Sequence, residues 1–283
     1  MWRAALDRAR AYIGPLERML SVDEWQRAAR FRSSHDRERF VITRGFLREV
    51  LGAYVQTDPA DVQFDTGPKG KPSVRAGAAT EPVQFSLSHS DSIALLAITA
   101  DRPVGIDIAK VSRDPEHDPI VRQFFSAVEC QEYFRLDDVE KPRAFARLWT
   151  RKEAYLKALG EGLSKPLDSF TVRITPDAYA ESAVSAGERS GTGEWMVFGI
   201  EVPCGYEAAL AVQGQILNVF SWIWQPGAPV CKSSTSSYVP YKYPLPRDDR
   251  RDPLANRHID TANRLPPKRA RSIHRQEIAP GED

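Results

Sequence analysis

The order of hydrophobic periodicities constrains the fold of this chain most strongly, because a helical pattern followed by strand patterns occurs twice along it. The first round has helical spacing from Ser21 to about Tyr54 and strand patterns over Val83–Ser88 and Ile93–Ile98. The second round has helical stretches and then short strands, over Ile120–Phe134, Pro142–Leu159, Phe170–Ile174, Trp195–Val202, Tyr206–Val212 and Val219–Ile223. Separate runs of helices and strands predict an α+β protein rather than a βαβ winding.

Local signals predict where several of these elements begin and end. Ser21 and Glu24 have the spacing of a capping box, and Gly160 is a suitable residue to stop the helix that precedes it. The Gly-, Pro- and Lys-rich segment Thr66–Thr80 predicts a loop of turns. Residues 89–92 are expected to form the turn between the first two strands.

Composition excludes several classes of protein. The 283 residues include 39 Lys plus Arg and 38 Asp plus Glu, a net charge of +1, which argues against a generic nucleic-acid binder. Any bound anion must therefore be held locally. The three cysteines are too few for a disulfide framework, and no apolar run approaches a membrane span, so a cytoplasmic protein is expected. The first ten residues lack the apolar core of a secretory signal.

Beyond Gln225 the pattern changes. Residues 226–283 have many prolines, a basic cluster at Lys268–Arg271 and almost no periodic apolar pattern, which predicts a disordered tail. The cluster could be a nuclear-localisation signal or bind an acidic surface, but a solvated charge run explains it more simply.

Asp107 is the first candidate for a functional side chain. It lies inside the otherwise apolar strand predicted over Val104–Val111, with only Gly105 and Ala109 beside it on its own face. A buried carboxylate must be paired, hydrogen-bonded or bound to a metal. The small neighbours leave space for a ligand.

The second candidate group lies on the helix predicted over Pro142–Leu159. Lys152 falls in the middle of its apolar stripe, so this lysine must either extend to solvent or find an anion. Glu153 and Lys157 stand one turn apart at the edge of the stripe, where an ordinary surface ion pair is the simplest interpretation. Together with Asp107 and a histidine at a turn, however, these residues are suited to a hard divalent cation and a polyphosphate.

Five ordered motifs carry a resemblance to a known family. They are GKP (70–72), FSLSHS (85–90), VGIDI (104–108), FFSAVE (124–129) and LWTRKEAYLKALGEGLSKPLDSF (148–170). In this order and spacing the chain resembles a 4′-phosphopantetheinyl transferase of the Sfp type over about residues 23–212. The resemblance implies two similar α+β halves related by a pseudo-twofold, at 1–103 and 104–225, with coenzyme A and Mg²⁺ in the cleft between them. The C-terminal half would carry the metal ligands.

The resemblance also implies roles for residues around the metal and the pyrophosphate. Asp107 and Glu153 would hold Mg²⁺, and Lys157 would contact the pyrophosphate of coenzyme A. His89 would bind a phosphate oxygen and assist the departing 3′,5′-ADP. Either Glu129, or Glu153 through a water on the metal, would take the proton from the attacking serine, and the sequence does not decide between them.

A second set of residues would bind the nucleotide portion of coenzyme A. Ser88 and the backbone of Lys71 and Pro72 would line its site, while Arg44 and Arg27 would hold the 3′-phosphate, for which guanidinium groups are well shaped. One departure concerns the metal: the family often has a Glu where this chain has Ala109. That change removes one carboxylate, so lower metal affinity or an altered preference between Mg²⁺ and Mn²⁺ is expected.

The function implied is the conversion of apo acyl, peptidyl or aryl carrier proteins to their holo form, with coenzyme A as co-substrate. The alternative is a catalytically silent module that binds a carrier protein or coenzyme A, which Ala109 alone supports directly. A nucleic-acid role of the basic tail is a third hypothesis, and we expect deletion of 226–283 to leave transfer intact. Two fused halves favour a monomer, by family analogy.

Overall fold

The computed structural model describes most of the chain up to residue 230 and one short segment beyond it. The described residues are 1–75, 83–114, 116–160, 162, 165–175, 181–182, 184–185, 195–214, 219–230 and 239–241. They form two compact units. The first is built from Met1–Thr66, Pro72–Val104 and Leu217–Lys242, and the described part of the second comes from Gly67–Lys71 and Gly105–Ile216.

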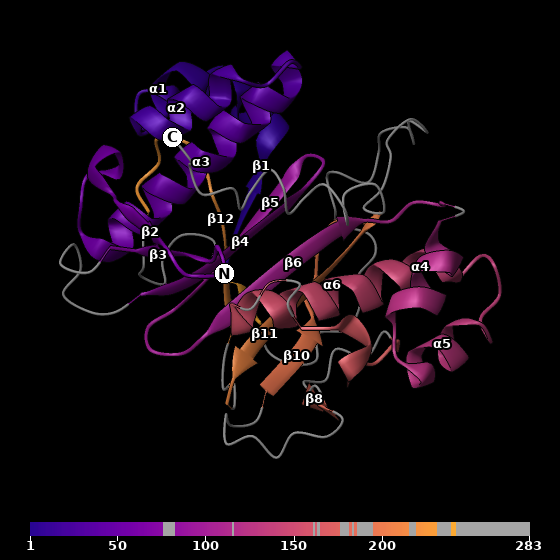
Figure 1. Cartoon of the computed structure of the whole chain (residues 1–283). Coiled ribbons are helices and arrows are strands. Elements are labelled where there is room, and N and C mark those ends of the chain that lie inside the picture. Colours follow the sequence, from indigo (N-terminus) through magenta and orange to yellow (C-terminus); the bar gives the residue numbers. More distant parts are fainter. Residues whose placement is uncertain are drawn as a thin grey trace. The chain divides into compact units, whose positions relative to one another are not determined.

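The first unit combines helices with a five-stranded sheet in the order β13-β12-β1-β5-β4 (Figure 1). Its helical elements are η1 (Leu6–Tyr12), α1 (Ile13–Glu17), α2 (Val22–Ala29), α3 (Ser34–Val55) and η2 (Pro59–Asp61). Its strands are β1 (Trp2–Ala5), β2 (Phe64–Thr66), β3 (Pro72–Val74), β4 (Gln84–Ser90), β5 (Ile93–Thr99), β12 (Val219–Ile223) and β13 (Val239–Tyr241). The core lies between α3 and the sheet, where Phe46 and Leu47 share one cluster with Phe85 and Leu96.

The second unit packs a long helix on a four-stranded sheet in the order β6-β11-β10-β8. Its helical elements are α4 (His117–Phe124), α5 (Ala127–Tyr133), α6 (Lys141–Leu159) and η4 (Leu167–Ser169). Its strands are β6 (Val104–Lys110), β7 (Phe170–Thr171), β8 (Glu181–Ser182), β9 (Val184–Ser185), β10 (Trp195–Gly199) and β11 (Tyr206–Gln213). Helix α6 lies along β11 and β10 (Figure 1), and Phe145, Leu148 and Tyr155 bury its apolar face.

The mixed α+β class is confirmed, and so are several element boundaries. The capping box of α2 forms, with Ser21 Oγ accepting from Glu24 N and Glu24 accepting from Ser21 N. Helix α6 ends at Leu159, and Gly160 adopts a φ of +70° that a residue with a side chain rarely takes. Hydrophobic period and turn chemistry therefore located these elements correctly.

Two of the three helical stretches predicted from periodicity, Ser21–Tyr54 and Ile120–Phe134, are in fact pairs of helices, whereas Pro142–Leu159 is one helix as predicted. A serine that caps a new helix begins the second member of each pair: Ser33 accepts from Asp36 N before α3, and Ser126 accepts from Glu129 N before α5. The chain has to leave helical geometry at such a cap, because the N-cap residue is itself extended. The break between the two helices is not visible in the hydrophobic pattern, because the apolar period continues across it.

Two predicted loops are partly strand. Strand β4 continues through His89 and Ser90, so its turn to β5 comprises only Asp91 and Ser92. Within the expected loop Thr66–Thr80, β3 pairs with β2 in a hairpin whose turn is closed by the bond from Gly67 N to the oxygen of Lys71. Residues 76–80 lie outside the described part of the chain.

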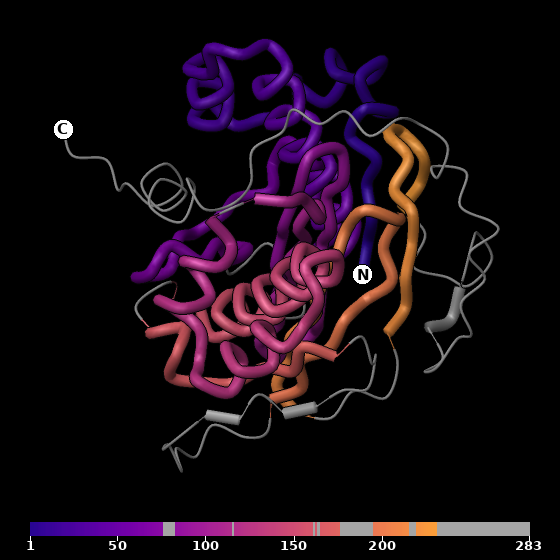
Figure 2. The backbone as a smooth tube through the Cα atoms, turned by 90° about the vertical axis from the view of Figure 1, so that its right-hand side faces the viewer, coloured from indigo at the N-terminus to yellow at the C-terminus, as the bar shows by residue number. Residues whose placement is uncertain are grey.

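The sheet of the first unit is completed by a strand from far along the sequence. Strand β12 pairs in parallel with β1, with Trp2 opposite Trp222, and Figure 2 shows the orange strand beside the indigo one. A division at residue 104 would place β12 in the second half. Within the expected tail, β13 pairs with β12, and the remainder beyond Val230 lies outside the described residues.

Candidate active site

The candidate metal ligand Asp107 projects from a strand that touches the backbone of α6. A Cβ atom added to Gly105 would lie 1.9 Å from the oxygen of Ala154 and 2.4 Å from the nitrogen of Ala158. Only glycine permits this approach, because neither neighbour is a side chain that could move aside. Asp107 is on the same face of β6 as Gly105, since alternate residues of a strand share a face. The packing therefore directs the carboxylate of Asp107 toward α6.

On α6, Lys157 meets this carboxylate. Its Nζ lies 2.8 Å from Oδ1 of Asp107, and the two side chains are 33% and 9% exposed. Glu153 stands one turn earlier on the helix and is half-buried. Since Ala154 and Ala158 touch Gly105, the contact with β6 falls beside both Glu153 and Lys157.

This donor set suits a hard cation that brings other ligands with it. In the described part of the chain no group of three or more His, Cys, Asp and Glu side chains is arranged to hold a metal ion. Mg²⁺ prefers oxygen, and it commonly takes only one or two protein carboxylates together with waters and phosphates. Asp107 and Glu153 therefore fit Mg²⁺ bound with a polyphosphate and do not form an all-protein cage. Ala109, on the face of Asp107, is buried with an exposure of 6% and supplies no oxygen.

Glu129, the alternative candidate for the base, is fully buried against Lys152. Lys152 Nζ lies 2.8 Å from Oε2 of Glu129 and also donates to the backbone oxygens of Leu167 and Phe170, at 2.7 and 2.8 Å. The three ammonium donors thus have three acceptors. Burial lowers the pKa of Lys152, and the carboxylate of Glu129 opposes that shift.

Both oxygens of Glu129 are engaged in structural contacts. Oε2 also accepts from Ser126 N in the capping box of α5, and Oε1 accepts from Val172 N at 2.7 Å. Neither Glu129 nor Lys152 has exposed side-chain surface. This geometry favours a structural role for Glu129. The sequence signals were the Ser-x-x-Glu spacing from Ser126 and the lysine within an apolar stripe, but local spacing could not pair them.

Lys71 belongs by its contacts to the second unit. Its Nζ donates to the oxygen of Ala158 at 3.2 Å, near the C-terminus of α6, where backbone oxygens are favourable partners for a cation. Its stem covers Gly160. Burial lowers the pKa of Lys71 to about 8. Pro72, the next residue, begins β3 and is exposed.

His89 and Ser88 occupy the end of β4 in the first unit. Ser88 is buried and His89 is exposed, as expected for neighbours on opposite faces of a strand. His89 stands opposite Ala94 of β5 and follows Phe85 and Leu87 on one face of the sheet. The imidazole of His89 is thus exposed at the end of this row.

Arg44, one of the two arginines expected to hold a phosphate, pairs with Glu24 together with Arg48. Arg44 Nε donates to Oε1 of Glu24 at 2.6 Å, and Arg48 Nε donates to Oε2 at 2.7 Å. Burial raises the pKa of Glu24, but Arg44 and Arg48 outweigh burial and leave the pKa below its usual value. Neither Glu24 nor Arg48 was predicted to belong to a phosphate site. Glu24 was recognisable from the sequence only as part of the capping box.

The group of Arg44, Arg48 and Glu24 keeps a positive excess. Burial lowers the pKa of Arg44; Glu24 opposes that shift, while Arg48 and Arg27 add to it by charge repulsion. Arg44 and Arg48 share the single carboxylate of Glu24, which leaves a charge of 2 − 1 = +1. Arg27 lies 5.5 Å from the ring centre of Phe40, and its charge repels that of Arg44. This positive charge would suit a phosphate.

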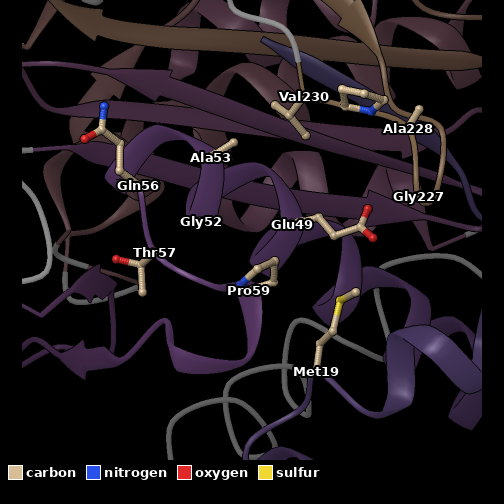
Figure 3. A pocket seen from close by; sticks show the side chains of 11 residues that line it. Met19, Glu49, Gly52, Ala53, Gln56, Thr57, Pro59, Gly227, Ala228 and Val230 are labelled. Carbon is tan, nitrogen blue, oxygen red and sulfur yellow. The ribbon is translucent and has the colours of Figure 1, made fainter.

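One cavity in the described part lies elsewhere in the first unit. It has a volume of about 510 Å³, and Figure 3 shows its mostly apolar lining, with Glu49 as the charged side chain among Gly52, Gln56 and Ala228. None of the site residues named above lines this cavity, so it has no part in assigning the site. Among the described helices, none is both long and apolar enough to cross a bilayer.

Comparison with known proteins points to a single family. A family model described as the 4′-phosphopantetheinyl transferase superfamily matches residues 103–197, and one described as 4′-phosphopantetheinyl transferase, N-terminal, matches residues 10–101. The 4′-phosphopantetheinyl transferase HetI of Nostoc sp. is 37% identical over 181 residues, which are 64% of this chain and 76% of that protein.

Two relatives from Bacillus show a similar degree of identity. The 4′-phosphopantetheinyl transferase Sfp of Bacillus subtilis is 33% identical over 158 residues, 56% of this chain and 68% of Sfp. The 4′-phosphopantetheinyl transferase psf-1 of Bacillus pumilus is 33% identical over 172 residues, 61% of this chain and 71% of that protein. With identities above 30% across more than two thirds of these relatives, the chain belongs to the 4′-phosphopantetheinyl transferase superfamily.

Proposed function

We propose that this protein transfers the 4′-phosphopantetheine arm of coenzyme A to a serine of apo acyl or peptidyl carrier proteins. The serine oxygen forms a bond to the β-phosphorus, and the bond from that phosphorus to the ADP oxygen breaks. The leaving 3′,5′-ADP keeps the electron pair, and the serine proton passes to a base. Positioning and charge neutralisation dominate reactions of this kind.

The observation that carries this proposal is the pair of Asp107 and Lys157 beside Glu153. Unlike Lys152 in the sealed pair deeper in the same unit, Lys157 is one third exposed, and the largely buried Asp107 keeps some exposed surface, so an incoming pyrophosphate and its cation can reach this pair. Asp107 and Glu153 would hold Mg²⁺, or Mn²⁺, which would supply a Lewis acid that neutralises charge on the pyrophosphate. Lys157 would then turn from Asp107 to the phosphate oxygens.

The other residues of the chain would bind and orient coenzyme A. His89 would donate a hydrogen bond to a phosphate oxygen, Ser88 and the Lys71–Pro72 backbone would line the nucleotide site, and the excess charge around Arg44 and Arg27 would hold the 3′-phosphate. We assign the serine proton to a water oriented by Glu153, because Glu129 is sealed by Lys152.

The direct test is to incubate the purified chain with an apo carrier domain, coenzyme A and Mg²⁺ and to weigh the carrier by mass spectrometry. We expect the carrier to gain one phosphopantetheine group and 3′,5′-ADP to appear in equal amount. A carrier that gains nothing with Mg²⁺ or Mn²⁺, while coenzyme A still binds, would establish the silent binding module instead.

Three finer statements complete the proposal. We infer a monomer that acts in the cytoplasm and whose 1–103 and 104–225 halves divide the work as above. Sedimentation of the purified chain would test the oligomeric state. Which carrier protein it serves is best found by identifying the carriers that it modifies in a cell extract.

A further inference from the structure

The turn that follows His89 has an unusual backbone. Asp91 has a φ of +50°, the left-handed region. In the described part of the chain the only other residue with a side chain in this region is Gln56, at the end of α3. Left-handed geometry is unfavourable for an L-residue, although Asp tolerates it better than most. Surrounding contacts must therefore hold Asp91 in place.

Contacts from two other elements anchor this turn. Arg39 of α3 donates from Nη2 to Oδ1 of Asp91 at 2.7 Å, and the two side chains are only 18% and 19% exposed. Leu6 N, at the start of η1, donates to the oxygen of Ser92 at 2.8 Å. A charged hydrogen bond with little solvent access is among the stronger of such contacts. Both residues of the turn are thus fixed to helical elements of the first unit.

The anchored turn lies directly beside His89. In the register of the hairpin, Ser90 is opposite Ile93 and His89 is opposite Ala94, so His89 is two residues from Asp91. The row Phe85, Leu87, His89 lies on the face that packs in one core with α3. Arg39 therefore extends from the helix that covers the face on which His89 stands.

We propose that Arg39 is a positioning residue, which fixes the imidazole of His89 by holding Asp91 in its left-handed conformation. The inference rests on the proposed function, in which His89 contacts the phosphate of coenzyme A. Without Arg39 the turn relaxes toward a more favourable φ, and the end of β4 turns with it. The imidazole then no longer points consistently at the phosphate.

A double-mutant comparison tests this mechanism. Arg39→Ala is expected to lower kcat/KM for coenzyme A about tenfold, a loss of roughly 1.4 kcal/mol. Asp91→Gly is expected to stay within twofold of the wild type, because glycine takes a φ of +50° without an anchor. In the Asp91→Gly background, Arg39→Ala should cause no further loss. Arg39→Lys should recover part of the rate, since lysine can still pair with Asp91.

The result that would overturn the proposal is a tenfold loss on Arg39→Ala that persists in the Asp91→Gly background. It would show that Arg39 affects the reaction by a route other than Asp91. Arg37→Ala is the matched control, because it removes another ion pair of α3, to Glu17, away from the turn. Thermal unfolding of every variant excludes loss of the fold.

A readout without catalysis separates this inference from the proposed function. The ring resonances of His89, assigned by comparison with a His89→Gln variant, should shift and broaden in Arg39→Ala and return to the wild-type position in the Asp91→Gly double variant. Unchanged His89 resonances in Arg39→Ala would refute the positioning role even if transfer were active. Shifted resonances in a protein without transfer activity would refute only the proposed function.

Discussion

Two lysines of one helix, five residues apart, meet carboxylates in opposite surroundings. Lys152 and Glu129 have no exposed side-chain surface, and backbone groups take up the rest of their bonding capacity. Lys157 and Asp107 have the same separation of 2.8 Å, but the lysine is one third exposed. A sealed pair has no room for a ligand, whereas an open pair can exchange one partner for another. The separation of nitrogen and oxygen is the same in both pairs, so it would not by itself distinguish a structural ion pair from a functional one.

The functional role of the open pair is tested most directly by removing the carboxylates there. Asp107→Ala and Glu153→Ala should each lower the transfer rate by about 100-fold or more, because charge stabilisation in the transition state is lost. The unfolding free energy of Asp107→Ala should change by less than about 1 kcal/mol, since Lys157 can be solvated. The carrier mass assay and urea unfolding measure the two quantities. Wild-type transfer by Asp107→Ala would contradict the metal assignment.

The sealed pair should behave in the opposite way. Lys152→Met leaves the buried carboxylate of Glu129 uncompensated, so we expect a loss of about 3–5 kcal/mol in unfolding free energy, measured in urea. Replacing both residues, by Lys152→Met with Glu129→Leu, should recover part of that loss. Transfer per folded molecule should stay near the wild type. A Glu129→Gln variant that is stable but inactive would instead identify Glu129 as the base.

Closing the contact between β6 and α6 should affect stability and activity together. Gly105→Ala places a methyl group against the backbone of Ala154 and Ala158, which must move apart at a cost of about 1–3 kcal/mol or more. Asp107 would then shift relative to Lys157, so the transfer rate should fall as well. Gly199→Ala is the control, because its Cβ would meet nothing closer than 3.7 Å. Equal stability of the two variants would contradict the close approach.

Adding a carboxylate to the open site should lower the Mg²⁺ concentration that transfer requires. Ala109→Glu would place a third carboxylate on the face of Asp107, so we expect half-maximal transfer at several-fold lower Mg²⁺. Ala109→Gln, of similar size without the charge, should not give this shift. An unchanged Mg²⁺ dependence in Ala109→Glu would show that position 109 does not face the ion.

The smallest expected effect concerns Lys71, a third lysine at α6. Its folded-state pKa of about 8 lies below the ordinary value of 10.5, so the unfolded chain binds more protons between these pH values. The contribution of this group to stability therefore rises as pH increases from 8 to 10.5. Relative to Lys71→Met, the wild type should gain unfolding free energy across that window. Lys69→Met, at an exposed neighbour, should track the wild type, and parallel curves for Lys71→Met would refute the shift.

Local chemistry made much of this molecule predictable from its sequence. The end of α6 at Gly160 and the capping box at Ser21 follow from rules that involve only neighbouring residues. The same holds for β5, whose apolar run appears in the structure within one residue of the expected range. Such features do not depend on the rest of the fold.

What could not be predicted depends on partners distant in sequence. The capping signal at Ser126 and the buried lysine at 152 were both visible, but only the fold brings Glu129 to Lys152. Likewise, the need for glycine at position 105 is explained only by the close approach of α6. The pairing of Arg44 with Glu24 joins two helices, α3 and α2. The hydrophobic period of a segment indicates which of its faces is buried, but it does not indicate which other element packs on that face.

The pairing of β1 with β12 has a consequence for biosynthesis. Trp2 is synthesised before its partner Trp222, which follows more than two hundred residues later in the chain. Until then β1 is the unpaired border of its sheet, with backbone groups open to other chains. The second unit has no such delay, because almost all of its described residues come from one continuous stretch. Among the described residues, the sheet of the first unit is therefore the later one to be completed, and we expect the closure of so long a loop to slow its folding.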